Sequence, residues 1–140
     1  MADSTGWCSL RIRFSERELA LLRGAEEVRG AALAHQPRPE VLRSALALAK
    51  AGHKLSASGP HGSISLEQPE VRLLIEALRF ATQEVHTIAN PSNQVAQSRR
   101  DAVLQAFPEL ADRGMWRSFG LTRELGALAD RLGTALRAKT

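Results

Sequence analysis

The sequence of 140 residues contains no tyrosine, a single cysteine and few aromatic residues, which make up 4% of the chain. Because Cys8 is the only cysteine, no internal disulfide can form, which is typical of a protein in a reducing compartment. The surrounding residues, GWCSL, offer neither a base nor a positive charge that would favour a thiolate. We therefore predict that Cys8 is a small hydrophobic residue at or near the start of a strand.

Long apolar runs are also missing. No stretch approaches the roughly 20 apolar residues that a membrane-spanning helix needs. The first ten residues, MADSTGWCSL, lack the basic and then apolar layout of a secretory signal. We therefore expect a cytoplasmic protein of bacterial type that has no membrane partner.

Motifs that carry chemistry are absent as well. The four histidines show no HxxxH or HExxH spacing and no pairing with cysteine, and the glycine-containing stretch ASGPHGS lacks the lysine of a P-loop. No catalytic residue, cofactor site or metal site is therefore predicted, and the chain is not expected to be an enzyme. The four histidines are His35, His53, His61 and His86. An enzyme whose site is assembled from distant residues remains an alternative.

What the chain does contain is the composition of an ordinary globular protein. Hydrophobic residues make up 44% and charged residues 24%, and the length suits one domain over residues 1–140 with one core. Nineteen basic and fifteen acidic side chains give a net charge of +4 without a basic tract. This balance permits binding to nucleic acid but does not require it.

One pattern occurs twice. The stretch RIRFSERELALL at 11–22 returns in outline 52 positions later as SISLEQPEVRLL at 63–74. In each copy, apolar residues first alternate with polar ones, as in a half-buried strand, and then recur at helical spacing. The alternating positions are Ile12 and Phe14 in the first copy and Ile64 and Leu66 in the second. Each copy therefore predicts a strand followed directly by a helix.

Both helix starts carry expected signals. Ser15 and Glu18 form the spacing of a capping box, in which each side chain bonds the other residue's backbone amide. In the second copy Pro69 takes the first turn, where its missing N–H costs nothing, and Glu70 matches Glu18. Similar junctions also arise by chance, because all strand-to-helix junctions share capping rules.

A second helical stretch follows the first helix in each copy. EVLRSALALAKAG places apolar residues on one side and ends at Gly52, the expected stop; those apolar residues are Val41, Leu42, Ala45, Leu48 and Ala49. The predicted plan is a βαα unit in residues 10–58, a second in 62–110 and a C-terminal helix at 117–138. The second-copy helix carries two apolar stripes and is expected to be central, although one stripe could instead face a partner.

The predicted fold class is α+β and predominantly helical, with about five helices and a small antiparallel sheet of two or three strands. The two repeated strands are expected to pair antiparallel across an approximate two-fold axis. The candidate third strand is Lys54–Ser58, which could turn back through 59–62 against 63–66.

The C-terminal helix offers the clearest candidate interface. Leucines spaced by four and three residues follow the a/d spacing of a coiled-coil seam, although two heptads do not require one, so the helix either closes the core or pairs with a second copy. Gly126 and Gly133 lie seven apart and predict close approach of another backbone. A cluster of Met115, Trp116 and Phe119 precedes the helix and is expected to plug the core or to anchor a partner. The predicted interface consists of Trp116, Phe119, Leu125, Leu128 and Leu132.

Nucleic-acid binding is the alternative. The predicted order of helix, strand, glycine-containing turn, strand and helix in residues 39–74 resembles the winged helix-turn-helix arrangement, which implies a recognition helix followed by a wing. The basic residues of the supposed recognition helix, at 39–51, are Arg43 and Lys50. Arg99 and Arg100 form a second possible phosphate contact.

The sequence as a whole favours a non-enzymatic protein that binds another protein or itself, as a regulatory or assembly module. The expected partner is a second copy of the chain in a homodimer, because the sequence has more apolar helix surface than a lone bundle needs.

Overall fold

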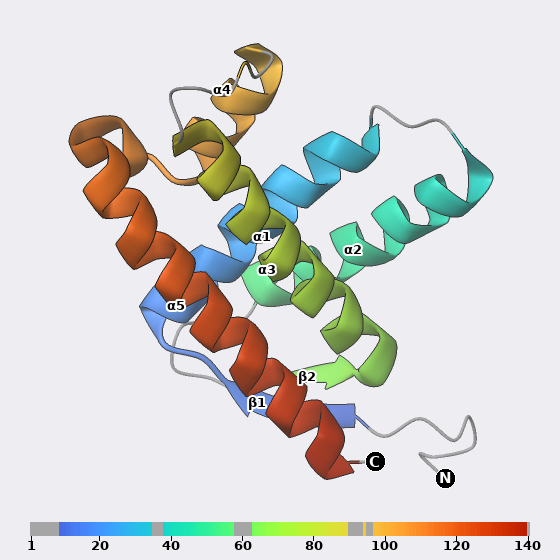
Figure 1. The fold of residues 1–140 in the computed structure, drawn as a ribbon. Helices are drawn as coiled ribbons and strands as arrows, with labels where there is room; N and C mark the ends of the chain where they lie inside the picture. Colours follow the sequence, from blue (N-terminus) through green and yellow to red (C-terminus); the bar gives the residue numbers. More distant parts are fainter. Residues whose placement is uncertain (1–8, 35–37, 58–62, 90–93, 95–96, 140) are drawn as a thin grey trace, which may run out of the picture.

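The computed structural model describes residues 9–34, 38–57, 63–89, 94 and 97–139, excluding the side chains of 111–117 and 139. The elements follow the order β1 (Ser9–Arg13), α1 (Glu16–Ala34), α2 (Pro39–Ala57), β2 (Ser63–Glu67), α3 (Gln68–Ala89), α4 (Gln97–Ala106) and α5 (Leu110–Lys139). Figure 1 shows a helical bundle with a small ribbon of two strands at one end and α4 at the other. The predominantly helical α+β class is therefore confirmed.

The two strands pair antiparallel, as predicted. Ile12 lies opposite Ile64, and Leu10 lies opposite Leu66. All four of these side chains are buried under the helices, whereas the alternate residues of both strands are exposed. The period-2 pattern thus places one face of the ribbon on the core and the other in solvent.

Both helices that follow a strand begin with the same hydrogen bond. The Ser15 amide donates to Glu18 Oε1 at 3.0 Å, and the Glu67 amide, 52 positions later, donates to Glu70 Oε1 at 2.9 Å. The first junction also has the reciprocal bond from the Glu18 amide to Ser15 Oγ, at 3.1 Å. The predicted capping box is therefore present.

Helix α3 lies at the centre of the bundle, as its two apolar stripes predicted. It packs against α1, α2, α4 and α5, and in Figure 1 α5 runs along it on the side away from α2. Seven apolar side chains of α3 are buried in the core: Val71, Leu74, Ala77, Leu78, Ala81, Val85 and Ile88.

The prediction of a third strand at Lys54–Ser58 is wrong, because Lys54–Ala57 form the last turn of α2. Ser58 lies outside the described residues. Gly52 does not stop the helix either. It is buried where α2 crosses α1, and a Cβ there would meet the side chain of Glu26. The helix continues because Leu55, one turn later, is fully buried.

The C-terminal helix begins earlier than 117, because Leu110 is buried and its amide donates to the Phe107 carbonyl at 3.1 Å. The backbone of 115–119 is thus helical and does not precede the helix. The close approach predicted for the glycines of α5 is also wrong. A Cβ on Gly126 would have nothing within 4 Å, and one on Gly133 would meet only the Arg137 side chain.

No helix in the described part of the chain combines the length and apolar character needed to cross a bilayer. Helix α5 is long enough, with 30 residues, but charged side chains along its exposed side interrupt its apolar character.

Candidate interaction surfaces

The leucine seam of α5 packs inside the chain. Leu125, Leu128 and Leu132 are at most 3% exposed and belong to the core that α5 shares with α3. Three of the five residues predicted to form an interface are therefore covered by the chain's own helices. The side chain of Trp116 lies outside the described residues.

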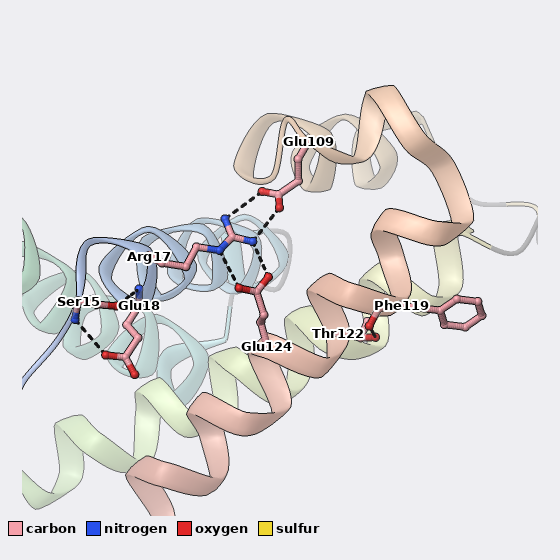
Figure 2. A network of polar contacts seen from close by, with 7 residues as sticks. All are labelled: Ser15, Arg17, Glu18, Glu109, Phe119, Thr122 and Glu124. Atoms are coloured by element: carbon pink, nitrogen blue, oxygen red, sulfur yellow. Dashed lines mark hydrogen bonds and ion pairs between the residues drawn. The ribbon is translucent and has the colours of Figure 1, made fainter.

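Phe119 is the described member of that set that does reach solvent, with 54% of its surface exposed. Figure 2 shows its ring projecting away from α5. It borders a shallow cleft between α3 and α5 that is lined also by Thr82, His86 and Arg123.

A charged network fixes the N-terminal half of α5 on the opposite side. The guanidinium of Arg17 donates to Glu124 at 2.7 Å and to Glu109 at 2.7 Å, as the fork in Figure 2 shows. These bonds, from Glu124 first and then Glu109, raise the pKa of Arg17. Because Arg17 and both carboxylates are partly exposed, the network positions α5 more than it stabilises the fold.

The four basic residues considered for nucleic acid fall into two groups. Arg99 is tied to the buried Glu84 by two hydrogen bonds of 3.1 and 2.6 Å, which raise the pKa of Arg99. Arg100 donates to the carbonyl of Ile88 at 3.4 Å. This pair therefore holds α4 onto α3. Arg43 and Lys50, by contrast, lie exposed on α2.

The winged arrangement proposed for 39–74 lacks its first wing strand, because Lys54–Ala57 are helical. The tip of the proposed wing, at 59–62, lies outside the described residues. Arg43 and Lys50 therefore sit on the outer side of a helix whose other side packs on α1 and α3.

That outer side of α2 carries an apolar stripe. Leu42 is 49% exposed and Leu46 is 72% exposed, and Ala49 is exposed on the same side. Their spacing of four and three residues keeps them in line. The inward side of α2 is separate and carries Leu48 and Leu55, which are buried. We call Leu42, Leu46 and Ala49 the α2 stripe.

The surroundings of the α2 stripe are basic. Arg43 and Lys50 flank it on one side and Arg38 lies beside its first turn, all three exposed. Within the described part of the chain, none of these side chains forms an ion pair. Glu40 is the acidic residue of this helix, and it points toward the cavity between α1, α2 and α3.

Analysis of the sequence missed this surface because it placed Leu42 and Ala49 together with Leu48 on one apolar side and did not single out Leu46. The signal that separates them is the second helical series, 42–46–49, beside the series 41–45–48 that continues to Gly52 and Leu55. Two apolar series on a helix that lies at the edge of a bundle leave one of them uncovered.

One cavity among the described residues bears on the enzyme alternative. The space between α1, α2 and α3 measures about 200 Å³, and its lining includes Arg29, Glu40, Ser44 and Glu76. The hydroxyl of Ser44 donates to the Glu40 backbone carbonyl at 3.2 Å, which is a local helix bond and not contact with a base.

The histidines lie apart where they are described. His53 is exposed on α2 and His86 is exposed on α3, whereas His35 and His61 lie outside the described residues. In the described residues, no three metal-ligating side chains gather.

Comparison with protein-family models, with curated proteins and with solved structures finds no match to this chain.

Proposed function

We propose that this chain is a cytoplasmic protein-binding module without catalytic chemistry, which docks a helix of another protein on the α2 stripe. The observation that carries the proposal is the exposure of Leu42 and Leu46 at 49% and 72% on a helix that is anchored from its other side. An isolated exposed leucine is ordinary, but two in line on a rigid element provide anchors for a partner.

The apolar contribution of such a surface is limited but useful. Full burial of a leucine side chain contributes about 1.5–3 kcal/mol, and both leucines are already partly covered. Because α2 is held by Ala51 and Leu55 in the core, its backbone loses little freedom when a partner binds. The α2 stripe therefore suits a helix that adds further contacts at its rim.

Charge favours a foreign partner over a second copy. Arg38, Arg43 and Lys50 surround the α2 stripe, so two stripes placed together would bring like charges into contact, which is unfavourable. A helix with leucines along one side and carboxylates beside them would meet both the apolar and the basic parts. Self-association through α5 loses its support, because the leucine seam is already covered by α3.

The test uses two synthetic amphipathic peptides with the same leucine positions, one flanked by glutamates and the other by lysines. Isothermal titration should show binding of the glutamate peptide, and Leu46→Ser should weaken that binding at least tenfold, which equals about 1.4 kcal/mol. Phe119→Ser is the matched control, because it removes an exposed apolar side chain elsewhere and should leave binding unchanged.

Sedimentation of the same proteins separates the alternatives. The wild-type chain should be monomeric at high micromolar concentration. A dimer that Leu46→Ser dissociates would assign the α2 stripe to a second copy, and equal binding of both peptides would contradict the role of the basic rim.

A further inference from the structure

The outward face of the ribbon is a second surface that the proposed protein-binding role does not use. Six side chains point away from the core, and all are exposed and polar. Arg11 lies opposite Ser65, and Arg13 lies opposite Ser63. Ser9 and Glu67 form the pair at the other end of the ribbon.

This face sits on a firmly held support. The four inward side chains of the ribbon are between 0% and 7% exposed. The Arg13 carbonyl accepts a hydrogen bond of 2.7 Å from Arg131 of α5, and Arg131 also pairs with Glu18 at 2.6 Å. A ligand of the outward face would therefore meet a platform whose backbone is already ordered.

The two arginines of the ribbon differ from two cations of the neighbouring helices. Lys54 and Arg131, at the ends of the neighbouring helices α2 and α5, are tied to Glu70 and Glu18. Within the described residues, the guanidiniums of Arg11 and Arg13 enter neither an ion pair nor a hydrogen bond. Both are exposed on one strand and on one face, so they present two uncommitted positive charges side by side.

The spacing of this surface matches double-stranded DNA. Two residues of an antiparallel strand span about 6.8 Å, which equals two nucleotide steps of B-DNA, at about 3.4 Å of helix axis for each step. The major groove of B-DNA admits a two-stranded ribbon, and arginine there donates two hydrogen bonds to one guanine, while serine bonds to any base. Paired RNA offers no such groove, because its major groove is too narrow for side chains.

We propose that the outward face of the β1–β2 ribbon binds double-stranded DNA in the major groove, with Arg11 and Arg13 donating to guanine edges and Ser63 and Ser65 bonding the neighbouring bases. This site lies on the ribbon and not on α2, where the sequence placed a recognition helix. The acidic side chain of the face, Glu67, lies at the end of the ribbon away from Arg13 and lowers the affinity for phosphate.

The experiment measures anisotropy of labelled duplexes of random sequence at 50 and 150 mM salt. The variant Arg11→Ala with Arg13→Ala should bind at least tenfold more weakly than the wild type at both salt concentrations, because the lost hydrogen bonds go to base edges. Arg43→Ala with Lys50→Ala is the matched control, because it removes the same charge from α2 and should change the affinity less than threefold. Both arginines of the ribbon are exposed, so circular dichroism should show an unchanged fold.

Glu67→Gln provides a change of the opposite sign and should raise the affinity about two- to threefold at low salt. Duplexes selected from the random pool should be enriched in guanine, and this enrichment should disappear with the ribbon variant. The proposal is overturned if the wild type fails to bind at 50 mM salt, if the two double variants weaken binding equally, or if paired RNA binds as tightly as DNA. None of these outcomes affects the peptide binding expected at the α2 stripe.

Discussion

The two βαα segments of this chain, 9–57 and 63–106, agree in what they bury and differ in what they expose. Their strands pair with each other, and their first helices begin with equivalent hydrogen bonds from Ser15 and Glu67. Four buried residues of α1 recur as buried residues of α3 after 52 positions: Leu19 and Val71, Leu22 and Leu74, Ala25 and Ala77, and Leu33 and Val85.

The outer surfaces show no such agreement. Helix α2 has 19 residues and exposes leucines together with Arg43 and Lys50, whereas α4 has 10 residues and uses Arg99 and Arg100 to hold itself to α3. On the ribbon, β1 exposes arginines where β2 exposes serines. The buried residues that the two segments share pack the core. The exposed residues in which the segments differ form the two surfaces that we propose for binding.

The largest effect is expected from truncating equivalent core positions. Leu22 and Leu74 are both 0% exposed, so Leu22→Ala and Leu74→Ala should each lower the free energy of unfolding by about 2–5 kcal/mol. Urea unfolding measures both values. Because the positions are equivalent, the two losses should lie within about 1.5 kcal/mol of each other, and a larger gap would break the comparison between the segments.

A smaller effect on stability is expected from alanine at two glycines, with opposite signs, and it tests the packing of α4 on α1. A Cβ at Gly24 of α1 would clash with the ring of Phe107, which follows α4, so Gly24→Ala should destabilise the protein by about 1–3 kcal/mol. The control Gly126→Ala faces open space and should stabilise α5 by up to about 1 kcal/mol through helix propensity. Equal effects in thermal unfolding would mean that α4 does not pack against α1 as described.

The smallest effect concerns the glutamate that covers Gly52 where α1 and α2 cross. Burial, and secondly the charge of Glu27, raise the pKa of Glu26. A carboxyl with a raised pKa in the folded state destabilises the fold when charged, and this penalty disappears as the pH falls from the folded-state pKa toward the unfolded value of about 4.3.

Glu26→Gln should therefore melt slightly above the wild type at pH 7, and the difference should shrink as the pH approaches 4. Thermal unfolding at a series of pH values gives the comparison. A lower melting temperature of the variant at pH 7 would show that the carboxylate is stabilised at this crossing.

Local patterns predicted much of this fold. Alternation in Ile12 and Phe14 and the capping residues Ser15 and Glu18 identified the first junction, because strand period and cap chemistry depend on neighbours in sequence. The antiparallel pairing of the two strands followed from the repeated pattern, whereas the register that sets Ile12 opposite Ile64 comes from the structure. The central position of α3 followed from its two apolar stripes.

The errors arose where distant contacts override local signals. Gly52 has the features of a helix stop, but Glu26 of another helix lies over it and α2 continues. The leucine seam of α5 could either close the core or pair with a second copy. The sequence did not decide between these, because the packing of α5 on α3 depends on the three-dimensional arrangement. The exposure of Leu46 likewise depends on which side of α2 meets the bundle.

The ribbon register supports both the comparison of segments and the proposed DNA surface, and a cross-link tests it most directly. In a Cys8→Ser background, Arg11→Cys with Ser65→Cys places two thiols on directly opposed residues, whose Cα atoms lie about 4.5–5.5 Å apart in such pairs. We predict complete disulfide formation on mild oxidation without loss of helical signal, and none for the out-of-register control Arg13→Cys with Glu67→Cys. A first pair that stays reduced, or a control that cross-links as readily, would contradict the account.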